Sequence, residues 1–393
     1  MVSEIYPRMS LDDVADFRNG KSISPERYSE DGRYPVFGAN GQIARSNYIL
    51  NTEGVVAIGR VGAYCGSVHY IPGPSWVTDN AIVATAKAGN NIRFLYYLFD
   101  HLELRRTAIG SAQPLMTQGG LKVVHTVIPP VKVQEAIACI LGALDDKIEL
   151  NRQMNRTLEE MAQTIFKSWF VNFDPIRAKI AGQQPPRLKP EIAALFPDAF
   201  EDSVLGKIPK GWRIKTIGDV CDLAYGKALK ADQRQPGIVP VMGSNGQVGL
   251  HNEALVKGPG IVVGRKGNPG TITWVNSDFF PIDTAFYVVP HGGDDHPLTY
   301  LFYALEKLSL ANLSADSAVP GLNRNIAYRS EMVIPDRSIL ELFDKHLMTI
   351  RNRQSTIEEE SSTLSTIRNT LLPKLISGEL RVPDAERIAG RCT

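Results

Sequence analysis

The chain has 393 residues, a formal net charge of +1, 43% hydrophobic residues and 22% charged residues. This length predicts two domains, and the composition excludes disorder over most of the chain. No apolar run approaches the roughly 20 residues that span a bilayer, and the first ten residues lack a secretory signal pattern. The sequence therefore predicts a cytoplasmic protein that does not contact a membrane.

The four cysteines are far apart and form no CxxC pair, which argues against a zinc finger and a disulfide framework. They are Cys65, Cys139, Cys221 and Cys392. The nearly balanced charge does not indicate nucleic-acid binding by itself. A DNA-binding role would need a local basic face, or a more basic partner that shares the phosphate contacts.

The first predicted domain covers residues 1–131 and mixes strands with a helix. Short apolar runs bounded by glycine predict buried strands at 54–59 and 66–71, and a third strand at 81–86. Residues 91–107 have the spacing of an amphipathic helix with an aromatic face.

Residues 132–171 are predicted to form one long helix, because proline is absent and glycine almost absent. Apolar residues recur at alternating three- and four-residue steps, which is typical of a coiled coil. At ~1.5 Å per residue the helix is roughly 60 Å long. The stripe contains Ile137, Leu141, Leu144, Ile148, Asn151, Asn155, Leu158, Ala162, Ile165 and Trp169.

Residues 172–203 are rich in proline and predict an ordered, extended connector with a short helical patch at 190–195. Beyond the connector, the sequence of the first domain returns in residues 204–336. The segment from Tyr34 to Gln42 (YPVFGANGQ) matches the segment from Val239 to Gln247 (VPVMGSNGQ), at an offset of 240 − 35 = 205 residues. An offset this long predicts two copies of a whole domain.

A second long helix is predicted at 337–378, followed by a tail at 379–393. Its stripe contains Phe343, Leu347, Ile350, Gln354, Ile357, Ser361, Leu364, Arg368 and Leu371. Two such helices can pair as an antiparallel coiled coil with pseudo-twofold symmetry, which would hold the domains at opposite ends of a rod. The predicted fold class is α+β, with two tandem mixed α/β domains that are each followed by a long helix.

Three segments resemble the specificity subunits of type I restriction–modification enzymes. The segment 140–155 (ILGALDDKIELNRQMN) is similar to the family's central helix, and 158–174 (LEEMAQTIFKSWFVNFD) continues that pattern. The segment 196–212 (FPDAFEDSVLGKIPKGW) resembles the opening of the second target-recognition domain. The first repeat departs from this pattern, because it has only Tyr6-Pro-Arg-Met9 where a Gly-Trp opening is expected.

The resemblance implies a non-catalytic subunit whose two target-recognition domains each read one half of a bipartite, asymmetric site on double-stranded DNA. It implies a helix pair that sets the gap between the half-sites and docks two modification subunits. Those subunits would carry S-adenosylmethionine and methylate adenine, and two restriction subunits would use ATP and Mg. No cofactor is expected in this chain. The partner-docking candidates are Asp145 and Asp146, which are expected on an exposed face of the helix, together with Asn151 and Asn155.

The candidates for DNA contact are polar or basic side chains on glycine-bounded loops, since amide groups can bond adenine and arginine can bond guanine or phosphate. They are Lys21, Asn40, Gln42, Arg60, Ser111, Gln113, Lys227, Asn245, Gln247, Arg265, Lys266, Asn323 and Arg324. Structural roles remain open: the Asn-Gly pairs could form type I′ hairpin turns. The arginines could pair with Asp79 and Asp283, and the remaining loops could pack at a domain–helix junction.

The sequence contains no motif for catalysis in this chain. It lacks an Asn-Pro-Pro-Tyr or Asp-Pro-Pro-Tyr motif and a GxxxxGK[ST] phosphate loop. The loop 291–296 (HGGDDH) could bind a metal but has no counterpart in the first repeat, so no metal site is predicted. An autonomous DNA-binding protein, such as a repressor, and a coiled-coil scaffold remain as alternative functions.

Overall fold

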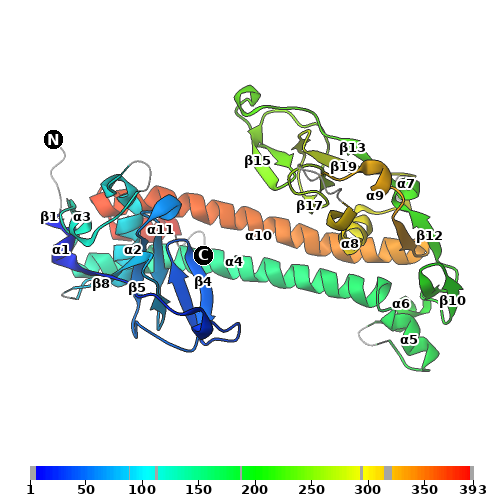
Figure 1. Cartoon of the computed structure of the whole chain (residues 1–393), viewed down its shortest axis with the longest axis horizontal. Helices are drawn as coiled ribbons and strands as arrows, with labels where there is room; N and C mark the ends of the chain where they lie inside the picture. Colours follow the sequence, from blue (N-terminus) through cyan, green and yellow to red (C-terminus); the bar gives the residue numbers. More distant parts are fainter. Residues whose placement is uncertain are drawn as a thin grey trace. The chain divides into compact units, whose positions relative to one another are not determined.

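The computed structural model describes residues 6–87, 89–110, 114–185, 188–292, 295–313 and 321–389. The chain divides into two compact units. Unit 1 consists of Met1–Arg152 and Glu359–Thr393, and unit 2 of Gln153–Glu358. Each unit therefore contains one globular domain and parts of two long helices, α4 (Val131–Phe170) and α10 (Arg337–Ser377), which Figure 1 labels.

The domain of unit 1 contains two sheets whose strands are mostly antiparallel. One has the order β2-β8-β5-β6 and the other β4-β3-β7. Every residue of β5 is buried, as expected for a run of Val, Ala, Ile and Gly at the centre of a sheet. The strands are β1 (Arg8–Ser10), β2 (Ala15–Asn19), β3 (Tyr34–Gly38), β4 (Gly41–Ser46), β5 (Val55–Gly59), β6 (Val68–Ile71), β7 (Trp76–Val77), β8 (Ala81–Ala86) and β9 (His125–Val127).

In unit 1 the helix α2 (Ile92–His101) packs on a sheet of the domain and shares a hydrophobic core with the first long helix, α4. The helix α2 contacts β5, β6 and β8 through an aromatic face that includes Phe94 and Phe99. The same core contains Ile137, Leu141 and Leu144 of α4. Shorter helices are α1 (Leu11–Val14), α3 (Gln118–Lys122) and α11 (Val382–Ala389), and 3-10 turns lie at Pro25–Arg27, Gly62–Tyr64 and Leu104–Thr107.

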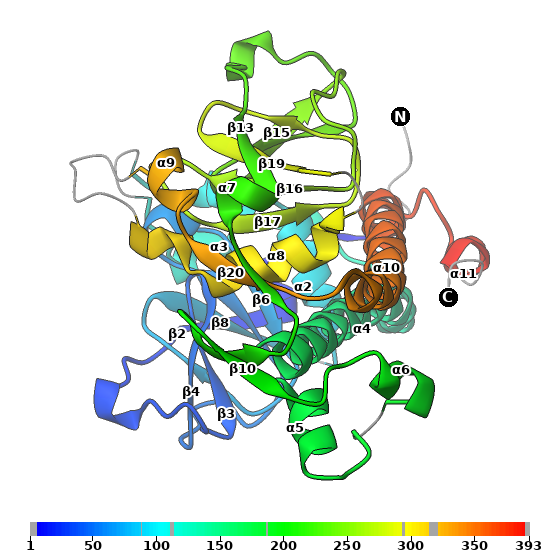
Figure 2. The same ribbon diagram turned by 90° about the vertical axis from the view of Figure 1, so that its right-hand side faces the viewer.

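The domain of unit 2 repeats this topology strand for strand, so the repeat that the sequence predicts is confirmed as a structural one. Its sheets have the orders β13-β19-β16-β17 and β15-β14-β18, and α8 (Leu298–Lys307) lies against β16 and β17 (Figure 2). The strands are β12 (Arg213–Thr216), β13 (Cys221–Tyr225), β14 (Val239–Gly243), β15 (Gly246–His251), β16 (Gly260–Gly264), β17 (Ile272–Val275), β18 (Phe280–Pro281), β19 (Ala285–Pro290) and β20 (Glu331–Ile334).

The matching short elements occur at matching places. A capping box between Ser10 and Asp13 begins α1, and one between Thr216 and Asp219 begins α7 (Ile217–Val220). In each domain a strand near its start pairs antiparallel with a strand near its end, β1 with β9 and β12 with β20. The domain of unit 2 also contains α9 (Arg324–Ala327) and 3-10 turns at Ala231–Gln233 and Leu310–Leu313.

The long helices are α4 (Val131–Phe170) and α10 (Arg337–Ser377), and both pass from one unit into the other. They run antiparallel within each unit. In unit 1 Asp145 contacts Arg368 and Asn151 contacts Ser361, while in unit 2 Asn155 contacts Gln354. The predicted fold class, two mixed domains that are each followed by a long helix, is confirmed.

The connector differs from the prediction. Instead of one short helical patch in an extended segment, it contains α5 (Asp174–Ile180) as well as α6 (Pro190–Ala194). The prolines explain the difference, since Pro175 and Pro190 stand in the first turn, where a helix does not need the missing N–H. The hairpin of β10 (Phe200–Ser203) and β11 (Gly206–Pro209) follows.

Candidate nucleic-acid interface

Each domain brings three chain segments together at the end of its central strand, and we call this place the strand-end site. The first segment is the Gly-Lys pair that follows β2 or β13, and the second is the arginine that follows β5 or β16. The third leads into the short helix α3 or α9. In unit 1 the Met116 N–H donates to the Arg60 carbonyl (2.8 Å), and in unit 2 the Leu322 N–H donates to the Arg265 carbonyl (2.9 Å).

The glycine of the Gly-Lys pair is required by close backbone packing. A Cβ on Gly20 would lie 2.1 Å from the Thr78 carbonyl oxygen, and one on Gly226 would lie 2.2 Å from that of Ile282. The following lysines, Lys21 and Lys227, have exposed side chains while their N–H groups donate to β7 and β18. The strand-end site thus fixes the backbone of a lysine whose ammonium group remains in solvent.

The two arginines are held in the same way in both domains. Arg60 Nη1 donates to the main-chain carbonyl of Asp79 (3.3 Å), and Arg265 Nη1 donates to that of Asp283 (3.0 Å). Both residues are half-buried. The structural alternative, in which Asp79 or Asp283 holds the arginine, is therefore confirmed in part: the same aspartates are the partners, but through their main-chain carbonyls, and the arginines are only half-buried. Lys266, the next residue, is exposed, and its backbone forms a bridge with Gly321.

Unit 2 adds an aromatic ring that sequence reasoning did not single out. Tyr225, the last residue of β13, is 47% exposed. The guanidinium carbons of Arg265 and Arg324 each lie 4.8 Å from the centre of its ring. Such cation–π contacts hold a guanidinium in place without a carboxylate. The signal in the sequence was a difference between the repeats, because Asn19 occupies the matching position at 225 − 206 = 19.

Asn323 has a structural role at the start of α9. Its side chain accepts hydrogen bonds from the N–H groups of Asn325 (3.0 Å) and Ile326 (3.4 Å), so it is the N-cap of α9. Thr117 caps α3 at the matching place in unit 1. Ser111 and Gln113 lie outside the described residues.

The Asn-Gly hairpins do not contain a type I′ turn, which was the structural alternative to a DNA-contacting role. Asn40 and Asn245 do not have positive φ values; the positive φ belongs to Gly41 (93°) and Gly246 (90°). A type I′ turn needs positive φ at both central residues, so these turns are of another type. The side chains of the four hairpin candidates, Asn40, Gln42, Asn245 and Gln247, are exposed.

The hairpin residues divide between two places in unit 2. Thr271 Oγ1 donates to the Ser244 carbonyl (2.7 Å), which ties the turn containing Asn245 to the loop that follows Arg265. Gln247 instead lines a hollow of about 410 Å³ together with Trp274 and Arg351. Asn245 is therefore the better placed of the two to extend the strand-end site.

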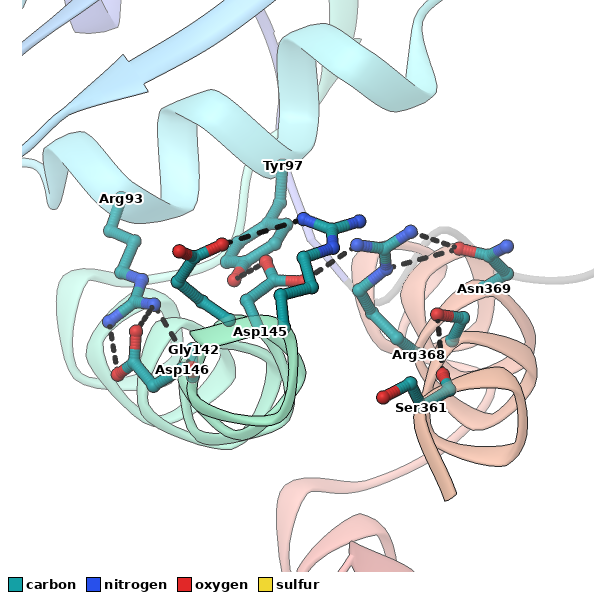
Figure 3. Close-up of polar contacts among 11 residues, drawn as sticks. Arg93, Tyr97, Gly142, Asp145, Asp146, Ser361, Arg368 and Asn369 are labelled. Carbon is teal, nitrogen blue, oxygen red and sulfur yellow. Dashed lines mark hydrogen bonds and ion pairs between the residues drawn. The ribbon is translucent and has the colours of Figure 1, made fainter. Parts of the chain in front are cut away.

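Of the two aspartates among the partner-docking candidates, Asp145 is less exposed than the sequence predicts and Asp146 is exposed as predicted. Asp145 was expected on an exposed face, but its carboxylate pairs with Arg368 (2.6 Å) and accepts from the Tyr97 hydroxyl (2.6 Å; Figure 3). Burial and this contact raise the pKa of Tyr97, so the phenol remains a donor. Asp146 stays 69% exposed while it pairs with Arg93 (2.6 Å).

The two asparagines lie between the helices. Asn151 is fully buried, and its amide donates to Glu360 (2.8 Å) and Ser361 (3.2 Å). Asn155 is half-buried and donates to the Gln354 carbonyl (3.3 Å). Buried polar pairs in a coiled-coil stripe fix its register. Asp146 is thus the one docking candidate with a largely exposed side chain.

Neither a metal cluster nor a membrane-spanning helix is found in the described part of the chain. In the loop 291–296, whose residues 293 and 294 lie outside the description, His291 pairs with Asp222 (3.2 Å). His296 is buried, with Nε2 3.5 Å from Lys215 Nζ. Burial lowers the pKa of His296, and the nearby Lys215 acts in the same direction.

Comparison with known proteins gives one consistent result. The family model described as "Type I restriction modification DNA specificity domain" matches residues 6–160 and 209–359. The HindI specificity subunit of Haemophilus influenzae is 26% identical over 333 residues, which cover 68% of this chain and 71% of that protein. The MjaIX specificity subunit of Methanocaldococcus jannaschii is 25% identical over 340 residues, with 76% and 71% covered.

A solved structure has the same fold. The S subunit of a type I restriction–modification system from M. genitalium superimposes with a TM-score of 0.64 and 18% sequence identity, over 95% of this chain and 97% of that one. Because the family model matches twice and covers both repeats, the chain belongs to the family of type I restriction–modification DNA specificity proteins. It is a specificity subunit of a type I restriction–modification system.

Proposed function

We propose that this chain is the non-catalytic subunit that reads a bipartite, asymmetric target in double-stranded DNA. One observation supports this most directly. Both domains have the same backbone frame at the strand-end site, but its side chains differ between them. Two copies of one frame with different side chains can read two different half-sites, so the target is asymmetric.

Residues that are the same in both domains suit contacts with the DNA phosphates, and residues that differ between the domains suit contacts with the bases. Arg60 and Arg265 are matched and make the same carbonyl contact, which suits a common role on the phosphate backbone. Lys21 and Lys227 are likewise matched and exposed. These few basic groups explain how a chain of net charge +1 can approach DNA.

The long helices suit a second role, in spacing and assembly. Because α4 and α10 are each continuous from one unit into the other, they can set the gap between the half-sites. Two modification subunits would dock along them and supply S-adenosylmethionine, and two restriction subunits would supply ATP-driven steps with Mg. Asp146 is the first docking position to test, because its side chain is the most exposed of the four candidates. The complex would act in the cytoplasm, on chromosomal or invading DNA.

Gel-shift assays of the purified chain, alone and with a modification subunit, separate this function from its alternatives. Sequence-specific binding that needs the modification subunit supports the proposal. Equally tight specific binding by the chain alone would favour a repressor-like protein. Absence of DNA binding in both conditions would favour a coiled-coil scaffold.

A further inference from the structure

The strand-end sites of the two domains differ at two positions whose side chains contact each other in unit 2. In unit 2 these are Tyr225 and Arg324, in contact through the ring and the guanidinium. An offset of 206 residues places Asn19 and Gln118 at the same positions of unit 1 (225 − 206 = 19; 324 − 206 = 118). Residues that read bases must differ between domains that read different half-sites, whereas residues that hold phosphates need not.

In unit 2 aromatic packing holds Arg324. Its guanidinium carbon lies 4.8 Å from the ring centre of Tyr225 and 5.6 Å from that of Tyr328. Tyr328 is itself anchored, because its hydroxyl accepts from the Leu223 N–H (3.0 Å). The Nε of Arg324 is buried without a hydrogen-bond partner, so the described contacts of this side chain are with rings. Ring packing restricts the guanidinium before any ligand arrives.

The charge of this cluster is not neutralised within the described residues. Neither Arg265 nor Arg324 forms an ion pair with a carboxylate there, although both lie against the same ring. Two guanidinium groups beside one half-exposed tyrosine favour a ligand with acceptor atoms. Arg265 is already fixed by the Asp283 carbonyl, as Arg60 is by that of Asp79, so Arg265 belongs to the shared frame.

The described residues of unit 1 form no such cluster at the matching positions. In the orientation of the Gln118 amide that gives both its nitrogen and its oxygen a partner, the nitrogen donates to the Phe17 carbonyl (3.0 Å) and the oxygen accepts from the Asn19 N–H (3.1 Å). Gln118 therefore ties the end of β2 to the start of α3. The matched position therefore holds the guanidinium group of Arg324 in unit 2, whereas in unit 1 it holds Gln118, whose side chain bonds to the backbone.

We infer that Arg324, held on the ring of Tyr225, reads a guanine in the half-site of the second domain, and that the first domain has no equivalent reader. An arginine fork donates to O6 and N7 of guanine, and each such bidentate contact discriminates strongly against other bases. The ring reduces the conformational freedom that the arginine would lose on binding. This inference rests on the proposed function and specifies one of its reading positions.

The test is a map of methylated adenines by long-read sequencing in cells that carry the chain with its modification subunits. The wild-type chain is mapped first. A bipartite motif satisfies the proposed function, and its absence contradicts that function before any variant is considered. The variants are Arg324→Gln and Tyr225→Asn, which install the first-domain residue types. Arg329→Gln is the matched control, since Arg329 is an exposed arginine five residues further on.

For Arg324→Gln we expect one guanine position in one half-site to relax, with discrimination reduced about tenfold or more, and the other half-site unchanged. Tyr225→Asn should relax the same position less, and Arg329→Gln should leave the motif unchanged. Arg324→Lys keeps the charge but loses the planar fork, so it should also relax that position.

Two outcomes would overturn the inference. The first is an unchanged motif in Arg324→Gln. The second is uniformly weaker methylation with the motif intact, which would make Arg324 a phosphate contact. A thermal unfolding curve of each purified variant distinguishes these outcomes from misfolding, because a misfolded second domain would remove the whole half-site rather than one position.

Discussion

Both units join their long helices through an ion pair, but the domain's tyrosine contacts that pair differently in each unit. In unit 1 the acid is on α4 and the base on α10, as Asp145 and Arg368. In unit 2 the acid is likewise on α4 and the base on α10, as Glu159 and Arg351. Tyr97 and Tyr303 each donate to the acid of α4 (2.6 and 3.0 Å), and Tyr303 also accepts from the base, Arg351 (2.7 Å). The helix that follows the domain therefore carries the acid in unit 1 and the base in unit 2.

This comparison explains why the helices select each other. An offset of 206 residues makes Arg351 the counterpart of Asp145 (351 − 206 = 145). Pairing of α4 with a second α4 in the same register would place Glu159 opposite Asp145. Pairing of α10 with a second α10 would place Arg368 opposite Arg351. Like charges repel across both self-pairs, and charges of this kind set partner choice in coiled coils.

The largest expected effect comes from lengthening both helices. One heptad inserted after Arg152 and one before Glu359, at the limits of the two units, should add roughly 10 Å to the helix pair, or about three base pairs of duplex. We expect the wild-type motif to disappear from a methylation map, replaced by a wider gap or by no methylation. Retention of the original gap would mean that the helices do not set the spacing.

The two charge pairs should differ in what they contribute to stability. The Arg351 side chain is 9% exposed and lies over Trp274 and Phe302, whereas that of Arg368 is 29% exposed. We expect Arg351→Ala to reduce the free energy of unfolding by about 3–5 kcal/mol, because it leaves a half-buried carboxylate unpaired. Arg368→Ala should cost about 1–2 kcal/mol.

Urea unfolding followed by circular dichroism measures this difference, because circular dichroism follows both units. Trp169, Trp212 and Trp274 lie in unit 2 and Trp76 in unit 1, so tryptophan fluorescence reports chiefly on unit 2. Fluorescence of the same samples therefore serves as the control that assigns the loss in Arg351→Ala to unit 2. Equal losses of stability in the two variants would contradict the assigned difference in burial.

Exchanging the charges of one pair should alter partner choice rather than stability. With Asp145→Arg and Arg368→Asp together, the pair within unit 1 keeps opposite charges. Self-pairing of either helix would then bring opposite charges together with Glu159 or Arg351. We expect the exchanged chain to form concentration-dependent dimers in light scattering, while the wild-type chain and the single variant Arg368→Ala do not. Dimers of the wild-type chain under the same conditions would refute the charge-selection argument.

The smallest expected effect is on the pH dependence of stability, and it should occur in unit 2 alone, because the matched residue of unit 1 is not a histidine. Burial holds the pKa of His296 below its ordinary 6.5, so the unfolded state binds a proton more readily than the folded state. Stability from this group is complete above pH 6.5 and declines as the pH falls below it. The matched residue of unit 1 is Asn90 (296 − 206 = 90), which accepts a hydrogen bond from Gln134 (2.8 Å).

His296→Asn should therefore flatten the pH dependence of unit 2 unfolding between neutral and mildly acidic pH. Urea unfolding at several pH values measures it. His346→Asn is the control, since His346 is a histidine of the same unit on α10. The same slope in wild type and His296→Asn would show that other groups dominate the pH dependence.

The sequence predicted the features that repeat or recur, because periodicity and self-similarity are local signals. The stripe on α10 placed Phe343, Leu347, Ile357 and Leu364 correctly, and all four are buried. The stripe on α4 similarly contained the buried Asn151. What it missed depends on contacts between distant segments. The sequence predicts an exposed Asp145 because its partners in the structure, Tyr97 and Arg368, are far from it in the sequence.

Tyr225 was missed for a different reason. Matched residues drew attention to the shared frame, whereas the reader we infer lies where the repeats differ. The helix α5 was missed because Pro175 was interpreted as a mark of extended chain, although proline is well suited to the first turn of a helix.

The central claim, that two copies of one frame read two different half-sites, is tested most directly by mapping methylated adenines genome-wide with the gene for this chain present and deleted. The map is repeated with a modification subunit co-expressed, so that a silent partner cannot hide the activity. We predict that one bipartite motif with two unlike halves appears with the chain and disappears without it. A motif with identical halves, or a map that does not depend on the chain in either background, would contradict the account.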